Sequence, residues 1–351
     1  MGILARSPYI VEINETGQIE TKIELFLWNG NTTPMPSSPS YVLSKKIPSS
    51  NAPATYYDLS PYIREFIDHN TRQTITSSNA NTPSGQWCWV GMKKFKKIST
   101  IFIQVGTTVS YRAFDGYGYY EQGYNPTISG IHLDSGYTYN YFSDGSGDVG
   151  HLTIETLTGN SIRYTNLSTS ATSTTAFGAT ANVQDFPRVA IGNLTDGNLV
   201  ELISGGSTIW SATFQPKEEC KYTPVRCDFV NKYGAWQTEW FFKASNQTFN
   251  VENTEYNLMQ STYPDYSVTE GQRKVFNANG KTQLRVNTDW VSETYSETIK
   301  QLMLSERILI DYNTPAKINT KSTELFKHIN NHMINYQLEF EYAFDTINSV
   351  V

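Results

Sequence analysis

The sequence predicts a mainly β protein with two antiparallel β-sandwich-like domains and one or two short helices. The first observation is composition. Charged residues make up 17% and aromatic residues 13% of the chain, which is typical of all-β proteins that bury surface in an assembly. The second is the alternation of apolar and polar side chains in several short segments, the pattern of strands with one buried face. The third is length, because 351 residues exceed one ordinary sandwich and suit two domains.

The first domain, residues 1–166, is predicted to open with a β-hairpin. Its arms are Tyr9 to Ile13 and Ile19 to Trp28, joined by a turn that ends at Gly17. A short helix is expected from Pro61 to His69, because the preceding serine is a good N-cap and proline suits the first helical position. Further strands are expected at Gln86 to Met92, Ser99 to Val105, Thr108 to Phe114, Gly150 to Leu157 and Asn160 to Thr165.

A Ser/Thr-rich stretch from Leu167 to Asn182 separates the two predicted domains. Its serine, threonine and alanine residues bury little apolar surface, so we expect a linker or a long exposed loop. The two strands expected at Gly150 to Leu157 and Asn160 to Thr165 would form a pair directly before this stretch. The domain boundary is therefore placed at residues 167–182.

The second domain, residues 183–351, is also predicted to be mostly strand. Gly205-Gly206 should form a two-residue turn between two of its strands, and a helix is expected near 290–304, capped by Asp289 or Ser292. The segment from Cys220 to Phe242, CKYTPVRCDFVNKYGAWQTEWFF, is predicted to be one long hairpin with one buried face. The short strands before it are expected at Arg188 to Ile191, Leu199 to Ile203 and Ser207 to Phe214.

The C-terminal segment has the cleanest two-residue period in the chain. The side chains predicted to share the buried face are Ile334, Tyr336, Leu338, Phe340, Tyr342 and Phe344. The opposite face carries Asn335, Gln337, Glu339, Glu341 and Asp345. Burying six such apolar side chains contributes about 10 kcal/mol before conformational entropy is subtracted. We therefore expect this strand to be part of the core of the second domain.

Several of these segments resemble structural proteins of bacteriophage tails, chiefly from phages of Bacteroidetes-type hosts. In those proteins a strand ending near Phe-x-Asn-x-x-Gly-x-Trp recurs, and here the motif runs from Phe229 to Trp236. The same resemblance covers SPYIVEI, KIELFLWNG, YVLSKKIP, YYDLSPYIREFI and the C-terminal HMINYQLEFEYAFDTINSVV. It spans both ends and the centre of the chain, but not the region from Gly106 to Asn182. The matching segments concern fold and assembly, so no active site comes with them.

The resemblance implies a virion structural protein of the tail, in the baseplate, the tail tip or a connector ring. Such a protein would be made in the host cytoplasm and would assemble as a multi-copy ring with copies of itself and other tail proteins. A second hypothesis is a receptor-binding or adhesin protein that contacts host surface glycans. A third is a cell-surface glycan hydrolase, which the sequence disfavours because it offers no catalytic arrangement.

A Tyr/Gly-rich segment between Tyr111 and Phe142 is the candidate contact site. Tyrosine offers a flat apolar ring and a hydroxyl group at a small entropic cost, which suits protein contacts and sugar stacking alike. A subunit interface, plain strand packing and glycan binding all remain possible for it. The candidate residues are Tyr117, Tyr119, Tyr120, Tyr124, Tyr137, Tyr139 and Tyr141.

No arrangement of residues predicts catalysis, so we expect no enzyme, no cofactor and no metal. His328 and His332 lack the adjacent glutamate and third ligand of a zinc protease, so a polar loop or frayed helix is preferred. The string from Asp144 to Asp148 lacks the distal glutamate of a calcium loop, so a β-turn is preferred. Cys220 and Cys227 should point to opposite faces of one strand and stay reduced, as in a cytoplasm.

The charge of the chain argues against nucleic-acid and membrane partners. Its net charge is −6, whereas duplex DNA and anionic membranes both require a basic surface. The basic run Lys93, Lys94, Lys96 and Lys97 is expected to be a solvated or inter-subunit face. No apolar run is long enough to span a bilayer, and the first residues lack a signal-peptide core. We therefore expect no sequence-specific nucleic-acid binding and no membrane insertion.

Overall fold

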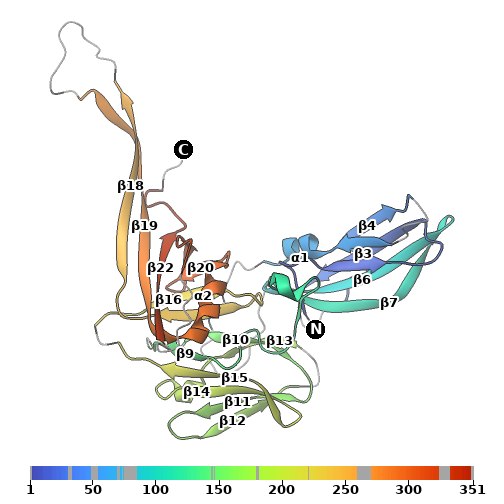
Figure 1. Ribbon diagram of the computed structural model, residues 1–351, viewed down its shortest axis with the longest axis horizontal. Helices are drawn as coiled ribbons and strands as arrows, with labels where there is room; N and C mark the ends of the chain where they lie inside the picture. The colour runs from blue at the N-terminus through green and yellow to red at the C-terminus, as the bar shows by residue number, and fades with distance from the viewer. Residues whose placement is uncertain are drawn as a thin grey trace. The chain divides into compact units, whose positions relative to one another are not determined.

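The computed structural model describes residues 2–30, 34–48, 54–68, 72, 74, 85–143, 145, 147–178, 182–219, 221–258, 269, 271–323 and 333–348. These residues confirm a mainly β, sandwich-like fold, with five sheets and two α-helices among them (Figure 1). The chain divides into two compact units. Unit 1 contains Met1–Lys217 and Val230–Thr238, and unit 2 contains Glu218–Phe229 and Glu239–Val351.

This division differs from the boundary expected at residues 167–182. Within that stretch, β12 (Thr172–Ala176) pairs with β11 (Asn160–Asn166) at the edge of a sheet in unit 1. All five side chains of β12 are exposed, so the strand needs no apolar residues of its own, and its β-branched threonines suit an extended backbone. Low hydrophobicity here therefore marks an edge strand within unit 1.

Unit 1 contains a six-stranded sheet in the order β4-β3-β6-β7-β1-β8. Its strands are β1 (Gly2–Leu4), β3 (Glu20–Trp28), β4 (Tyr41–Lys46), β6 (Trp87–Ile98), β7 (Ile101–Phe114) and β8 (Thr127–Ile128). β1 runs parallel to β7, and the remaining neighbours are antiparallel. The two strands expected between Ser99 and Phe114 are one strand. The pairing of β6 with β7 shifts register between Met92 and Lys94, and the extra residues of β7 include Gly106 at φ 69°. A bulge thus lies in β7 where a break between two strands was expected.

The hairpin predicted at the N-terminus does not form. β2 (Ile10–Ile13) pairs with β5 (Thr55–Asp58) in a separate two-stranded sheet, while β3 pairs with β4 and β6. The turn after Ile13 thus connects strands of two different sheets that share one core, in which Ile13 and Val11 pack with Ile23 and Leu25. The strand positions were correct, but the pairing partner was wrong.

The first helix, α1 (Ser60–Phe66), begins one residue before the predicted start. Ser60 does not cap it. Its hydroxyl group donates a hydrogen bond to the Ser7 carbonyl at 2.7 Å and accepts one from the Tyr9 backbone at 2.7 Å. Ser60 thereby ties the helix to the N-terminal segment, and Ile63 is buried in the core beside β2 and β3. His69, the expected last residue of the helix, lies outside the described residues.

Two further sheets complete unit 1. They contain β9 (Thr138–Tyr141), β10 (His151–Thr156), β11, β12, β13 (Asn182–Pro187), β14 (Asn198–Ser204) and β15 (Ser207–Pro216). The predicted pairing of β10 with β11 is wrong, because β10 pairs with β13 and β11 pairs with β12 and β14. Arg188 to Ile191 is not a strand, since β13 ends at Pro187. The Gly205-Gly206 turn between β14 and β15 is confirmed. Both glycines have positive φ, at 56° and 84°, as a tight hairpin turn requires.

Unit 2 is built on a seven-stranded sheet in the order β17-β16-β20-β21-β22-β19-β18. Its elements are β16 (Val225–Val230), β17 (Trp236–Phe241), β18 (Asn246–Asn257), β19 (Arg273–Ser292), the 3₁₀ turn η3 (Glu293–Tyr295), α2 (Ser296–Met303), β20 (Ile308–Ile310), β21 (Thr314–Ile318) and β22 (Met333–Tyr342). The predicted helix near 290–304 is confirmed as α2, although it starts at Ser296, because β19 continues to Ser292. Ile299 and Leu302 of α2 are buried against the sheet.

The long hairpin between Cys220 and Phe242 is confirmed as β16 and β17, and Cys220 itself lies outside the described residues. The expected single buried face is wrong, because every residue of both strands is buried. The polar side chains pair instead: Arg226 and Asp228 form an ion pair at 3.0 Å, with side chains 1% and 0% exposed. Burial on both faces is tolerable because charged neighbours of opposite sign satisfy each other.

The tip of this hairpin, Val230–Thr238, belongs to unit 1, so the last residue of β16 and the first three of β17 are counted there and the rest of both strands in unit 2. The side-chain oxygen of Asn231 accepts hydrogen bonds from the backbone of Tyr233 and Ala235, which closes the turn. Gly234 has φ 78°, and a Cβ atom there would lie 2.7 Å from the Asp115 nitrogen. The Asn and Gly of the Phe-x-Asn-x-x-Gly-x-Trp motif therefore have a structural explanation: one closes the turn and the other permits close backbone packing.

The C-terminal strand confirms the predicted alternation in its central part. Tyr336, Leu338 and Phe340 are buried in the core of unit 2, whereas Ile334 and Tyr342 are partly buried against it. The expectation for Phe344 is wrong. Its side chain is 54% exposed, because β22 ends two residues earlier.

Candidate assembly interface

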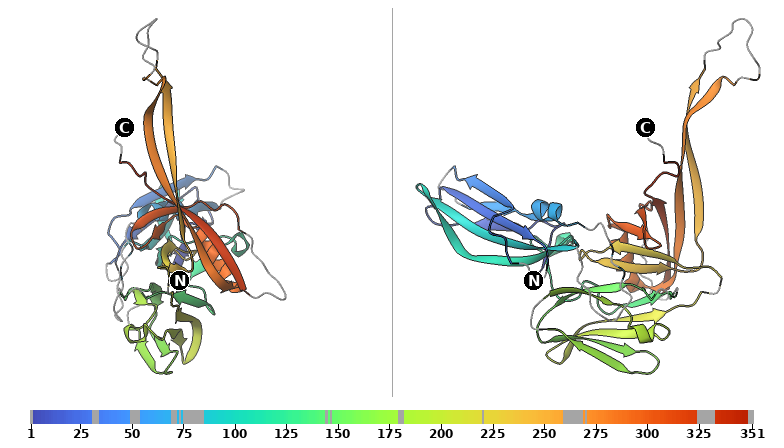
Figure 2. Two further views of the ribbon diagram at one scale, coloured as in Figure 1. Left: turned by 90° about the vertical axis from the view of Figure 1, so that its left-hand side faces the viewer. Right: turned by 180° about the vertical axis from the view of Figure 1, so that it is seen from behind.

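The most unusual surface of the described chain is a two-stranded ribbon in unit 2. It consists of β18 and the outer part of β19, Arg273–Thr282, and is called the ribbon below. β22 pairs with β19 only from Gln283 onward, so the ribbon continues beyond the rest of the sheet (Figures 1 and 2). All twelve residues of β18 are exposed. A strand this long with no buried residue is unusual in a folded monomer, because two-stranded ribbons are marginally stable in water.

The ribbon carries several exposed apolar side chains. Phe249 and Val251 of β18 stand opposite Thr282 and Gly280, so they share a face, and they are 56% and 61% exposed. The Phe249 ring lies over Gly280, where a Cβ atom would approach the ring to 2.1 Å. Phe276, which is 77% exposed, contacts Tyr256 edge-on farther along the ribbon. Exposed apolar groups gathered on one ribbon are typical of contact surfaces.

The end of the β6–β7 hairpin in unit 1 is a second exposed apolar region. Ile98, Ile101 and Ile103 are 41%, 67% and 48% exposed. The basic run nearby is partly neutralised, since Lys96 pairs with Glu15 and Lys97 with Glu20, each at 3.0 Å. This hairpin end combines apolar side chains with paired charges.

The first part of the Tyr/Gly-rich segment is divided between anchored and exposed tyrosines. Tyr117 lies half-buried beneath the Arg6 guanidinium, 4.8 Å from its ring centre, and contacts Tyr119 edge-on. Tyr119 is also half-buried, with the Lys232 ammonium 5.8 Å from its ring centre. Tyr120 and Tyr124, in contrast, are 98% and 73% exposed. Tyr120 and Tyr124 are therefore the two members of this group that present most of their rings to a partner.

The second part of that segment is core. Tyr139 and Tyr141 of β9 are 1% and 2% exposed, and Tyr137 is half-buried and stacked on Tyr139. The Tyr139 ring stacks on Phe214 at 5.5 Å, and the Tyr141 hydroxyl donates to the Leu194 carbonyl at 2.9 Å. Burial raises the pKa of Tyr141 well above its ordinary value. The seven candidate tyrosines thus do not form one site, and these three serve strand packing.

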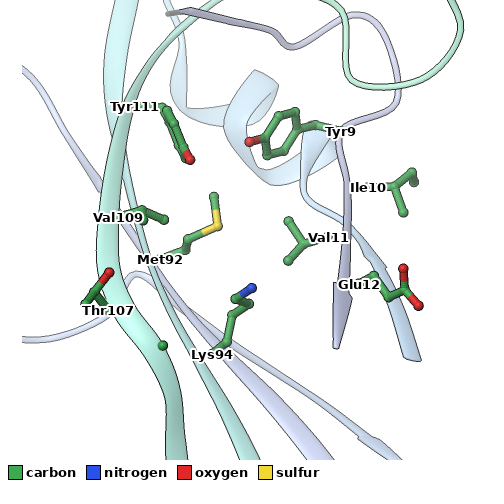
Figure 3. A pocket seen from close by; sticks show the side chains of 10 residues that line it. Tyr9, Ile10, Val11, Glu12, Met92, Lys94, Thr107, Val109 and Tyr111 are labelled. Atoms are coloured by element: carbon green, nitrogen blue, oxygen red, sulfur yellow. The ribbon is translucent and has the colours of Figure 1, made fainter. Parts of the chain in front are cut away.

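Unit 1 also has an open pocket of about 360 Å³ between β2 and the β6–β7 hairpin. Figure 3 shows the rings of Tyr9 and Tyr111 at one end, Lys94 at the other, and Met92 and Val11 between them. Burial, followed by the nearby Tyr111, raises the pKa of Tyr9. The lining is largely apolar and includes two charged side chains, Lys94 and Glu12.

A buried charged cluster in unit 1 was not predicted. Glu155 of β10 lies 3.2 Å from the Arg112 guanidinium and 3.5 Å from the His132 imidazole. Burial opposes the charge on Glu155, but His132 and Arg112 bring its pKa below the ordinary value. Asp185 of β13 accepts a hydrogen bond from Thr153 at 2.7 Å. Burial dominates at Asp185 and raises its pKa to about 7.

This charged cluster is inaccessible to a substrate, which argues against an active site. The side chains of His132, Glu155 and Asp185 are at most 1% exposed, and none of them lines the pocket in Figure 3. The Arg112–Glu155 pair joins β7 to β10, which belong to two different sheets, in the interior of unit 1. A sequence signal existed in the alternating His-x-Thr-x-Glu of His151–Glu155. Its burial on both faces, however, depends on strands distant in sequence.

Some of the other candidate metal sites in the sequence fall on residues that the structure does not describe. His328 and His332 lie outside the described residues, as do two residues of the Asp144 to Asp148 string. No group of three or more potential ligands among the described residues is placed to hold a metal ion. Cys88 and Cys227 are free, buried thiols. Within the part of the chain that the structure describes, no helix has both the length and the apolar character to cross a membrane.

Comparison with known proteins adds no relative. The chain matches no protein-family model, no curated protein and no solved structure.

Proposed function

We propose that this chain is a virion structural protein of a bacteriophage tail, located in the baseplate, the tail tip or a connector ring and present as a multi-copy ring. The observation that carries the proposal is the ribbon. Its β18 strand is exposed along all twelve residues, yet it carries Phe249 and Val251. Long exposed strand edges pair readily with other chains. A ribbon of this kind suits a protein whose neighbours in an assembly cover it.

The positions of the phage-like sequence segments support this proposal. The Phe-x-Asn-x-x-Gly-x-Trp motif is the tip of the β16–β17 hairpin, and KIELFLWNG covers most of β3. YYDLSPYIREFI covers most of β5 and all of α1, and the C-terminal segment contains β22. The resemblance therefore lies in the framework of both units, whereas the ribbon provides surface for neighbours. The function is then geometric, and the protein is not an enzyme.

The proposed partners are copies of this chain and other tail proteins, assembled in the host cytoplasm. The free thiols Cys88 and Cys227 suit a reducing compartment. Net charge of −6 disfavours direct binding to the phosphate backbone of DNA, since such binding requires a basic surface.

A receptor-binding role is the second candidate, and one observation favours it. Tyr120 and Tyr124 are 98% and 73% exposed and lie four residues apart around the short 3₁₀ turn Tyr120–Gln122. Exposed aromatic rings on a glycine-rich loop suit stacking against sugars. This role is compatible with a place at the tail tip, where the same loop would face the host surface.

The proposed location is tested by labelling phage particles. Antibodies raised against the purified chain and coupled to gold would be imaged on intact particles of the phage that encodes it. We expect label on the tail, and disruption of the particles should release the chain in a constant ratio to other tail proteins. Particles that carry no label and contain none of the chain by mass spectrometry would overturn the proposal.

A further inference from the structure

The ribbon has two open edges. β18 is the last strand of its sheet, so its outer edge has no strand partner among the described residues. On the other side, β22 pairs with β19 only from Gln283 onward. The C-terminal tail reaches β19 at Asn279 and Gly280, where Thr346 donates a backbone hydrogen bond to the Gly280 carbonyl. The stretch from Arg273 to Ala278 therefore has β18 as its only strand neighbour in the described part of the chain.

The two strands of the ribbon carry opposite charge. β18 contains Glu252 and Glu255 and no basic residue, whereas the outer part of β19 contains Arg273, Lys274 and Lys281 and no acidic residue. Glu252 and Lys281 pair with each other inside the ribbon at 3.7 Å. The other three charges form no ion pair with any described residue. One edge of the ribbon thus has an uncompensated acid, and the other has two uncompensated bases.

These charges distinguish two ways of pairing ribbons. A two-fold dimer would place each edge against its own copy, so that the acidic β18 edge would meet a second acidic edge, or the basic β19 edge a second basic edge. Like charges directly opposite each other in a sheet are destabilising. A head-to-tail contact instead places the acidic strand of one copy against the basic strand of the next. Contacts of this type close into rings when the rotation between copies permits.

The direction of the strands also fits a ring. Rotation about a ring axis keeps all ribbons pointing the same way, so every β18 runs in one direction and every β19 in the other. The contact between β18 and the next copy's β19 is then antiparallel, like the pairing already present within the ribbon. Successive ribbons would continue one antiparallel sheet and satisfy the open backbone groups on both edges.

We infer that the ribbon binds a second copy of this chain, with the outer edge of β18 adding to the Arg273–Ala278 edge of β19 in the neighbour. Repetition of this contact closes the ribbons into a ring of antiparallel strands. Phe249 and Val251 of successive ribbons then lie on the same side of this sheet. The inference rests on the multi-copy ring proposed above and specifies which surface closes it.

Charge reversal in the full chain tests the contact. The variants are Glu255→Lys and Lys274→Glu, and the mass of each assembly is measured by light scattering after gel filtration over a range of concentrations. We expect wild-type rings and, for each single variant, association weakened about tenfold per contact, because attraction becomes repulsion across the strands. An equimolar mixture of the two variants should recover association. The recovery must arise between chains, since neither variant restores an opposite pair within itself.

Two control variants match the change of charge at other exposed positions. Lys46→Glu lies on the edge strand β4 of unit 1, and Glu121→Lys lies in the short 3₁₀ turn Tyr120–Gln122. Both should assemble like the wild type, and circular dichroism should show that all variants remain folded. A wild-type chain that stays monomeric, single variants that assemble normally, or a mixture that fails to recover would each overturn the inference.

The two proposals fail separately. If charge reversal has no effect but gold label marks the tail, the virion role stands and the ribbon contact is wrong. If the mixture recovers association but particles carry no label, the chain forms rings outside a phage tail.

Discussion

Phe340→Asp should unfold or severely destabilise unit 2. Phe340 is fully buried, at 0% exposure, in the middle of β22, where it stands opposite Leu284 of β19 and Ile318 of β21. Its ring lies 5.9 Å from the ring of Phe241. The substitution removes an aromatic side chain from the core and places a carboxylate there without a partner.

The magnitude follows from the two terms. Removing a buried phenylalanine side chain costs about 3–5 kcal/mol. Burying an unpaired polar or charged group adds roughly 2 kcal/mol or more, unless the carboxyl takes up a proton. The sum is about 5–7 kcal/mol, which is comparable to the whole stability of an ordinary domain. Phe340→Ala isolates the first term and should lose only that part.

The assay is thermal unfolding followed by circular dichroism and by tryptophan fluorescence. Gln337→Lys is the matched control, because Gln337 is exposed on the opposite face of the same strand. Glu339→Lys should also be mild by comparison, although it removes a hydrogen bond from Asn319 at 2.7 Å. Wild-type melting temperatures for both Phe340→Asp and Glu339→Lys would show that β22 is not core.

Three further predictions concern unit 1 and the ribbon. Burial raises the pKa of Asp185 to about 7, so stability is fully present below the unfolded pKa of about 4 and is lost as the pH rises through about 7. Asp185→Asn should remove this loss, and equal pH slopes of melting temperature in the two proteins would refute the assignment. Replacing Tyr120 and Tyr124 by Ser should leave folding and particle assembly unchanged but reduce adsorption to host cells if the loop binds glycans. Normal adsorption of the variant would show that Tyr120 and Tyr124 do not bind host glycans. Gly280→Val should displace the Phe249 ring, since even a Cβ atom would lie 2.1 Å from it. Faster protease cleavage within the ribbon would report the change, and an unaltered digestion pattern would contradict it.

The sequence predicted strands far better than their partners. Alternation located the cores of β2, β3, β14, β15 and β22, because each has a buried face that its own residues reveal. Pairing depends on residues distant in sequence. The turn after Ile13 has the residues of a hairpin, yet β2 pairs with β5, because Val11 and Ile13 bury their side chains against a different sheet. Turn residues show that the chain reverses direction, but they do not show which strand becomes the pairing partner.

The division into compact units differs from the boundary expected at residues 167–182 for a related reason. A Ser/Thr-rich segment has too few apolar residues to form a core, and that property suits a linker and an edge strand equally. β12 obtains its stability from backbone hydrogen bonds to β11, while its five side chains remain exposed. The return of Val230–Thr238 to unit 1 was also invisible in sequence, since it depends on close backbone packing of Gly234 near Asp115.

The tyrosine segment shows what composition can and cannot identify. Tyr139 and Tyr141 alternate on β9 and are buried, whereas Tyr120 and Tyr124 lie in a turn and are exposed. Composition alone gave them equal weight as contact residues. The period of two around Tyr139 was the available sign of a core strand.

The charged residues of the ribbon are present in the sequence, but their arrangement in space depends on the pairing of β18 with β19. Glu252 and Glu255 precede Arg273 and Lys274 by about twenty residues, a spacing that says nothing by itself. Once β18 and β19 pair, the acids and bases fall on two opposite edges of one ribbon. An isolated ribbon would leave Glu255, Arg273 and Lys274 without an opposite charge in the described chain, whereas a ring of ribbons supplies one at every contact. The same register thus explains why the ribbon carries opposite charges on its two edges and is exposed in a single copy.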